Sequence, residues 1–250
     1  MVAAAPPSGP GAAPRRFGRL DALRGAAMVW MAAFHFGFDL QQSGHWRQDF
    51  YADPFWTTQR SAIVGLFLLC AGIGQAIAAG RGQPWAAFWR RWAQIAACAL
   101  AVSAASYVMF PRSFITFGVL HGIAAMLLLT RLAAARLDGR WLWPLGLLAV
   151  ALPQLFGHPF FDTRATDWVG LVTRKPVTED YVPILPWLGV MLWGHAAGAW
   201  ALRCRAGWLQ GRLPAALAPL AALGRWPLTF YMLHQPLLIG ALLAWQRLRG

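Results

Sequence analysis

Five residues of the first apolar stretch could act together, because their spacing places them on one face of a helix. Arg24, Met28, Met31, His35 and Asp39 follow one another at steps of four, three, four and four residues, which keeps side chains in line along a helix. The Asp39 carboxylate lies one turn beyond His35 and is expected to accept a hydrogen bond from its ring. That bond would fix the tautomer of His35 and prepare it as a general base. We therefore predict His35 and Asp39 as catalytic residues, the alternative being a structural pair that holds this helix against a neighbour.

Three other histidines belong to apolar stretches, where polar side chains are costly and are functional hypotheses by default. His121 is expected at a depth similar to that of His35, so these two rings could face each other. His234 lies near the middle of the last apolar stretch. We predict that His121 and His234 line the substrate path or bind the acceptor. His195 lies among small residues and is interpreted as a core histidine bonded to a backbone carbonyl.

The composition indicates a membrane protein. Of the 250 residues, 58% are apolar and 12% are charged, whereas soluble domains have about 45–50% and about 25%. The mean hydropathy is +0.45. Fifteen Trp and fifteen Phe residues exclude a disordered chain, which would be poor in aromatics. The predicted fold class is all-α, a polytopic bundle of membrane helices.

Seven segments are apolar and close to the length of about 20 residues that a helix needs to cross a bilayer. They are predicted at 20–40, 58–79, 88–110, 114–134, 141–157, 183–202 and 224–245. The fifth is the shortest, and a miscount is most to be expected there or at 205–222. Residues 1–19 are predicted to be a disordered cytoplasmic tail, and residues 20–250 to form one membrane domain.

The distribution of basic residues predicts the orientation. With the N-terminus inside, the cytoplasmic segments carry 14 of the 22 basic residues and the outer segments carry eight, as the positive-inside rule requires. We therefore expect a multi-pass protein of the bacterial cytoplasmic membrane, with its N-terminus inside and its C-terminus outside. A nucleic-acid partner is not expected, because such a protein would gather its charge on one soluble face.

The outer segment before the sixth span, TRKPVTEDYVPILPW, combines acidic and aromatic residues. Carboxylates hydrogen-bond to hydroxyl groups and aromatic rings stack on sugar faces, so Asp180 is predicted to bind a polyhydroxylated acceptor. An aromatic belt at the membrane interface is the alternative. No spacing typical of a metal site occurs, and no metal is expected.

The sequence resembles the catalytic domain of heparan-α-glucosaminide N-acetyltransferase and its bacterial relatives of unassigned function. The resemblance covers nearly all of the chain beyond residue 19 and is carried by RLDALRGAAMVWMAAFHFGFDL, LFLLCAGIGQAIA, ITFGVLHGIA, DYVPILPWLGV and LGRWPLTFYMLHQPLLIG. It implies a multi-helix membrane acyltransferase that takes acetyl groups from cytoplasmic acetyl-CoA. The acceptors that it implies are amino or hydroxyl groups of sugars on the opposite side.

One motif of the family is missing. The essential histidine of the animal enzyme belongs to the loop just before the second matched span. The matching stretch here, DFYADPFWTTQR, has Tyr51 or Asp53 near that position and no histidine, while His45 lies too far upstream. Either the chemistry has moved to a membrane histidine such as His35, or acetyl transfer of that kind is not performed.

Two arginines at cytoplasmic helix starts, Arg24 and Arg225, are predicted to hold the phosphates of the coenzyme. Arg24 and His35 are eleven residues apart, about 16 Å along a helix, and an extended pantetheine arm has comparable reach. A donor bound inside could therefore present its thioester near the outer leaflet.

The leading hypothesis is an integral membrane acyltransferase that uses acetyl-CoA to modify a sugar or envelope glycan outside the membrane. One alternative is a transporter or permease with proton-relaying histidines, although no inverted repeat of the kind common in transporters is visible. The other is a non-catalytic membrane subunit of an envelope assembly. The sequence leaves the oligomeric state open, including a homo-oligomer.

Overall fold

The computed structural model describes residues 16–249, and within this range the chain is helical with no strand. The long helices are α1 (Gly18–Gln42), α2 (Pro54–Gly80), α3 (Trp85–Met109), α4 (Val119–Arg136), α5 (Leu142–Leu155), α6 (Ile184–Cys204) and α9 (Pro227–Arg249), and the short ones are α7 (Ala206–Gln210) and α8 (Ala218–Leu223). Of the predicted disordered tail, residues 1–19, the part up to residue 15 lies outside the described residues. The last two residues of the tail belong to α1.

One long helix overlaps each of the seven predicted segments, which confirms the predicted positions of these helices. Four of the described helices, α2, α3, α4 and α9, are long and apolar enough to cross a membrane. The others depart from a simple span, since α1 carries charged residues and α5 has only 14 residues. The count of seven spans and the single domain over 20–250 therefore stay predictions. The segment 205–222 adds no span, because α7 and α8 have 5 and 6 residues.

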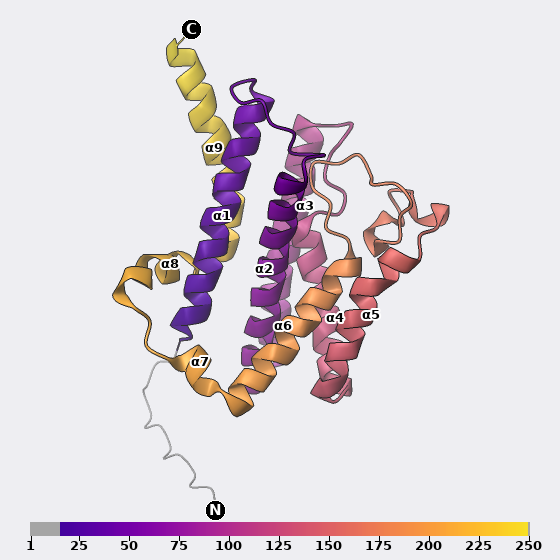
Figure 1. The fold of residues 1–250 in the computed structure, drawn as a ribbon, viewed down its shortest axis with the longest axis vertical. Coiled ribbons are helices and arrows are strands. Elements are labelled where there is room, and N and C mark those ends of the chain that lie inside the picture. The colour runs from indigo at the N-terminus through magenta and orange to yellow at the C-terminus, as the bar shows by residue number, and fades with distance from the viewer. Residues whose placement is uncertain (1–15, 250) are drawn as a thin grey trace, which may run out of the picture.

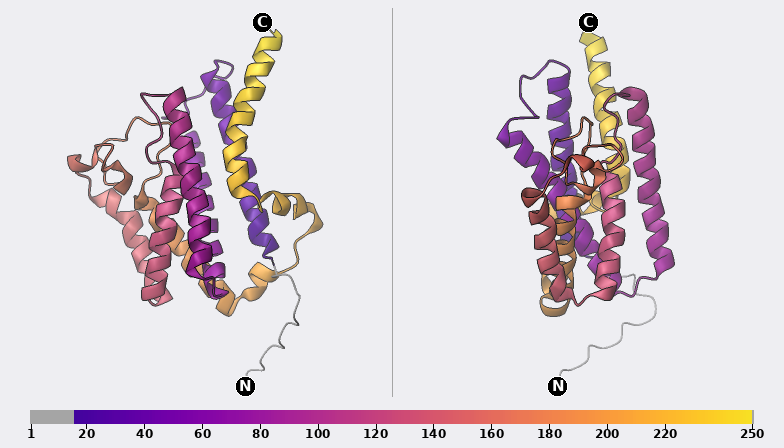
Figure 2. Two further views of the ribbon diagram at one scale, coloured as in Figure 1. Left: turned by 180° about the vertical axis from the view of Figure 1, so that it is seen from behind. Right: turned by 90° about the vertical axis from the view of Figure 1, so that its right-hand side faces the viewer.

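The helices form a bundle around a central pair, α2 and α6 (Figure 1). Helix α2 packs along α6, α5 lies against α6, and α4 contacts α2, α6 and α3. Helix α1 packs on α2, and α9 runs alongside α1. Seen from behind, α3 and α9 lie on the same side of the molecule (Figure 2). This arrangement places the stripe of the first helix between the centre of the bundle and α9.

Local sequence signals explain where several helices begin. The Asp53 side chain accepts a hydrogen bond from the backbone N–H of Phe55, and Pro54 occupies the first turn of α2, both of which favour a helix start. Helix α9 also begins with a proline and contains Pro236 in its interior. Proline cannot donate the usual backbone hydrogen bond, so α9 lacks one such bond next to His234.

Glycine permits the close approach of α2 and α6. A Cβ atom added at Gly72 would collide with the carbonyl oxygen of Met191 and lie 2.8 Å from the backbone nitrogen of His195. Small residues allow helix backbones to meet in this way, which is a common means of packing in membranes. Gly65 lies on the same helix, but the nearest atom to its added Cβ is a ring carbon of Trp187 at 3.9 Å.

We predict that Gly72→Ala destabilises the protein and Gly65→Ala does not. Alanine is worth up to about 1 kcal/mol more than glycine in a helix interior, and at Gly65 this gain meets no steric cost. At Gly72 the methyl group would push two backbones apart, and overpacking costs about 1–3 kcal/mol. The melting temperatures of the two variants in detergent, compared with the wild type, test the prediction. Equal stability of both variants would show that α2 and α6 can separate without cost.

Candidate functional site

The residue stripe predicted on the first helix does lie on one face of α1. Met28 and Met31 are buried, and the C-terminal part of the stripe faces α9. The rings of His35 and His234 lie 5.2 Å apart between centroids. One turn further on, the side-chain amide of Gln235 donates a hydrogen bond of 2.8 Å to Oδ1 of Asp39.

The prediction that Asp39 accepts a hydrogen bond from the ring of His35 is wrong. Oδ1 of Asp39 is bonded to Gln235, and Oδ2 is buried without a hydrogen-bond partner among the described residues. Helix α9 supplies an amide donor for the carboxylate, and spacing along α1 cannot reveal that neighbour. His35 also has a different partner from the one expected, because its ring faces His234 rather than His121.

His234 is oriented as a base. Its Nδ1 lies 2.7 Å from the carbonyl oxygen of Tyr231. Since a carbonyl only accepts, Nδ1 carries the proton and Nε2 holds a lone pair. That Nε2 is buried and has no partner in the described chain. The ring of Phe230 stacks parallel to the imidazole at 5.7 Å. A histidine held in this tautomer can accept a proton at Nε2.

Both ring nitrogens of His121 take part in hydrogen bonds near the start of α4. Its Nδ1 accepts the backbone N–H of Gly118 at 3.3 Å, and its Nε2 lies 3.3 Å from the hydroxyl of Ser103. The Ser103 hydroxyl donates to the carbonyl of Ile115 at 2.6 Å, so Nε2 must be the donor toward Ser103. Both ring nitrogens are therefore occupied. This geometry favours a structural role for His121 over the predicted role in substrate binding.

Asp180 also has an internal partner. Its Oδ2 accepts the first backbone N–H of α4, from Val119, at 2.6 Å, where a carboxylate is favoured by the helix dipole. Burial nevertheless raises the pKa of Asp180. One oxygen of the carboxylate is thus used to begin α4, which leaves less of it for the predicted acceptor. His195 is buried on α6, as expected of a core histidine, but its Nδ1 has no partner among the described residues and does not make the expected bond to a backbone carbonyl.

A pocket of about 370 Å³ lies between α1, α2, α3, α4 and α9. Three arginines, Arg24, Arg91 and Arg225, belong to its lining. The rest is mostly apolar and includes Phe67, Ala71, Phe88, Trp92, Ile95, Leu120, Ile123, Leu127, Leu228 and Tyr231. We call this space the arginine pocket. It brings together the two arginines predicted for coenzyme binding and adds Arg91.

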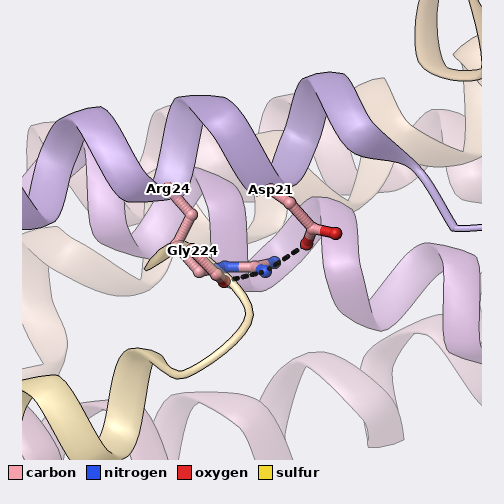
Figure 3. A network of polar contacts seen from close by, with 3 residues as sticks. All are labelled: Asp21, Arg24 and Gly224. Atoms are coloured by element: carbon pink, nitrogen blue, oxygen red, sulfur yellow. Dashed lines mark hydrogen bonds and ion pairs between the residues drawn. The ribbon is translucent and has the colours of Figure 1, made fainter. Parts of the chain in front are cut away.

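Polar groups in the wall of the arginine pocket are positioned by the surrounding chain. The Arg24 guanidinium donates to the Asp21 carboxylate at 3.0 Å and to the carbonyl of Gly224 at 3.2 Å (Figure 3). Gln75 is only 5% exposed. Its Nε2 donates to the carbonyl of Leu127 at 2.7 Å, while Oε1 has no partner in the described residues. An unpartnered amide oxygen in a pocket wall suits a ligand that carries an N–H group.

The arginine pocket and the histidine pair are neighbours along α9. Leu228 and Tyr231 line the pocket, and His234 follows Tyr231 by three residues, on the same side of the helix. The carbonyl of Tyr231 is also the group that holds His234. On α1 the same order holds, with Arg24 in the pocket and His35 beside His234. The two helices therefore connect a basic pocket with two neighbouring imidazoles, of which His234 is buried and His35 is half-buried.

Arg91 and Gln235 are not among the predicted site residues. Arg91 had a visible signal, because Arg90 and Arg91 are consecutive at the start of the third segment. Gln235 had only its position next to His234. Among the described residues, no group of three or more His, Cys, Asp or Glu side chains could hold a metal ion.

A family model shows what kind of protein has this arrangement. The model of the heparan-alpha-glucosaminide N-acetyltransferase catalytic domain matches residues 16–236, which include α1 and the part of α9 that carries His234 and Gln235. The chain belongs to this family. No curated protein and no solved structure matches the chain. Membership in the heparan-alpha-glucosaminide N-acetyltransferase family implies a membrane protein with transferase activity.

The essential loop histidine of the animal enzyme has no counterpart here. The residues near its expected position, Asp53 and Tyr51, make other interactions. Asp53 caps the start of α2. Tyr51 is exposed, and its hydroxyl accepts a hydrogen bond from the side-chain amide of Gln42 at 3.3 Å. Burial of part of its ring raises the pKa of Tyr51, so its hydroxyl stays protonated at neutral pH. The stretch 49–60 at the start of α2 therefore offers no imidazole, and the loop's His45 lies further upstream, whereas the α1–α9 interface offers two imidazoles.

Proposed function

We propose that this protein is an acetyltransferase of the bacterial cytoplasmic membrane. It takes an acetyl group from cytoplasmic acetyl-CoA and transfers it to an amino or hydroxyl group of a sugar or envelope glycan on the outer side. The observation that carries the proposal is that α1 and α9, which both line the arginine pocket, also hold the His35–His234 pair. Family membership supplies the reaction class, and this arrangement supplies the residues.

The arginine pocket suits the donor in charge and in shape. Arginine binds phosphates through charge-assisted hydrogen bonds, and three arginines line the pocket. Its apolar walls suit the methylene groups of a pantetheine arm, and Oε1 of Gln75 can accept a hydrogen bond from an amide N–H of that arm. In this proposal Arg24, Arg91 and Arg225 bind the phosphates. Asp21 is a positioning residue, since it holds the Arg24 guanidinium.

The histidine pair would act on the acceptor. The acceptor's amino or hydroxyl group must lose a proton as its new bond to the acetyl carbon forms, while the thiolate of coenzyme A leaves. Nε2 of His234 has a free lone pair for that proton, and His35 lies beside it to act with it as base. Asp39 would act through Gln235 by holding α1 and α9 in register, because its carboxylate is hydrogen-bonded to Gln235 and not to His35.

The central test is acetyl transfer by the purified protein in liposomes. With acetyl-CoA on the cytoplasmic side and a glucosamine-containing acceptor on the other, we expect release of the coenzyme A thiol and an equal amount of acetylated acceptor. Mass spectrometry of the acceptor identifies the modified atom. No binding of acetyl-CoA by folded protein would contradict the proposal, and a proton flux coupled to sugar uptake would favour a transporter instead.

The orientation makes a separate prediction. The start of α1 and the end of α9 lie at opposite ends of the bundle (Figure 1), as an odd number of crossings requires. Because basic residues favour a cytoplasmic N-terminus, alkaline phosphatase fused after residue 250 or inserted in 158–182 should be active outside. A fusion after residue 136, at the end of α4, should be inactive. Activity of that fusion together with inactivity of the other two would reverse the orientation.

A further inference from the structure

A second cavity, separate from the arginine pocket, lies among the loops at the end of the bundle where α4 begins. It has a volume of about 180 Å³ and is lined by Phe114, Thr116, Asp162, Arg164, Asp167, Pro176, Val177 and Thr178. A single water molecule needs only about 10–15 Å³ by this kind of measure. We call this space the outer-loop cavity. Neither it nor its residues take part in the proposed acetyl transfer.

The walls of the outer-loop cavity are held in place by hydrogen bonds. Asp162 accepts bonds from the backbone N–H and the hydroxyl of Thr173. Arg164 donates to the carbonyl of Arg112 at 3.0 Å, and its guanidinium lies 4.9 Å from the centre of the Phe114 ring. The Asp162 bonds hold the 156–183 segment together, and the Arg164 contacts join it to the loop before α4. The cavity is thus a defined space between two anchored segments.

One oxygen of a carboxylate in the cavity wall lacks a partner. Asp167 is only 2% exposed, and its Oδ1 is buried without a hydrogen-bond partner in the described part of the chain. Its backbone carbonyl is fixed by the hydroxyl of Tyr181 at 2.7 Å. Burial raises the pKa of Asp167. A buried acceptor without a donor is unfavourable, so a ligand that brings a donor to Oδ1 would stabilise the site.

The charges of the cavity select the kind of ligand. A cation would be attracted by Asp162 and Asp167 but repelled by Arg164. An anion would be attracted by Arg164 but repelled by the two carboxylates. A neutral hydroxyl group avoids both penalties, because it can donate to a carboxylate and accept from a guanidinium. The apolar surfaces of Pro176 and Val177 provide contacts for the C–H groups of a ring.

We infer that the outer-loop cavity binds one neutral, hydroxyl-rich ring of monosaccharide size, with ring hydroxyls donating to Asp167 and accepting from Arg164. This binding does not depend on acetyl transfer. On the proposed function, the cavity would hold a sugar unit of the acceptor that does not itself react, and would thereby favour an oligosaccharide over a single sugar.

The test measures binding of three sugars with the same ring to the purified full-length protein in detergent, without acetyl-CoA. Methyl glucoside is neutral, glucosamine is cationic and glucuronate is anionic. With methyl galactoside and methyl mannoside added to cover ring stereochemistry, ligand-observed NMR or calorimetry gives the affinities. We expect at least one neutral glycoside to bind saturably, and the two charged sugars to bind several-fold more weakly than it does.

Two variants test the location. Asp167→Asn keeps the shape and removes the charge, and is expected to weaken neutral-sugar binding about tenfold or more, because bonds to charged groups are worth about 1.5–3 kcal/mol. Val177→Trp, at a side chain that is 80% exposed, should fill the cavity without disturbing the fold and abolish binding. Asp138→Asn, the same chemical change at the other end of the bundle, is the control and should bind like the wild type.

Several results would overturn the inference. They are the absence of saturable binding by every neutral glycoside, tighter binding of either charged sugar, or unchanged binding by folded Val177→Trp. Failure of the proposed function would appear elsewhere, as a lack of acetyl-CoA binding with sugar binding intact. The two outcomes are therefore independent.

Discussion

Replacing His234 by alanine is expected to lower the rate of acetyl transfer about 10²–10⁴-fold, the usual cost of removing a general base. His35→Ala should lower it by a similar factor, because the two rings lie 5.2 Å apart between centroids and no other imidazole is placed beside them. Acetyl-CoA affinity should change little in either variant, since neither ring lines the arginine pocket.

The double variant tests directly whether the two histidines act as one unit. Residues that act as one unit are strongly non-additive, so the His35→Ala, His234→Ala double variant should be no slower than the slower single variant. A product of the two losses would mean separate roles instead. Wild-type activity in His234→Ala would remove that residue from the mechanism.

Two controls belong to this series. His45→Ala should keep full activity, because His45 is exposed and bonded to the nearby Ser43 hydroxyl at 2.9 Å. Asp39→Asn should keep the fold, since an amide fits the same space and can still pair with Gln235. If Asp39 only positions α1 against α9, kcat falls less in this variant than in His234→Ala and KM for acetyl-CoA is unchanged.

Removing Arg91 and Arg225 together is expected to weaken acetyl-CoA binding about 100-fold or more. A hydrogen bond to a charged group is worth about 1.5–3 kcal/mol, and about 1.4 kcal/mol is tenfold in affinity, so each arginine contributes about 10–100-fold. Both side chains are exposed apart from their faces toward the pocket, and their loss should leave the fold intact. Arg24 is less suitable for this test, because it also bonds Asp21 and the Gly224 carbonyl.

Acetyl-pantetheine separates the role of these arginines from a general loss of structure. It carries the thioester and the arm but no phosphate, so its transfer should be equal in the wild type and the double variant. Arg140→Ala, in the short turn before α5, serves as the control and should bind acetyl-CoA like the wild type. An equal loss of both donors in the Arg91, Arg225 variant would mean that these arginines support the fold rather than the phosphates.

The sequence by itself determined the helices and the faces that they present. Apolar runs bounded by proline, glycine and arginine located all seven long helices, because backbone hydrogen bonds must be satisfied within each segment in an apolar surrounding. The spacing of Arg24, His35 and Asp39 placed them on one face of α1, because helical periodicity is a local property. Family resemblance also followed from the sequence, since its motifs are local.

Only the tertiary structure decided which side chains meet. His35 faces His234, Asp39 bonds Gln235, and Arg24 shares a pocket with residues about 70 and 200 positions away. None of these pairs follows from periodicity, because the packing of one helix on another depends on the shapes of both surfaces. The same reason applies to His121 and Asp180. From the sequence, the polar atoms of these two residues were expected to be available to a substrate. In the structure they accept hydrogen bonds from backbone N–H groups at the start of α4 and in the loop before it. The first N–H groups of a helix have no partner within the helix and bond to such side chains instead.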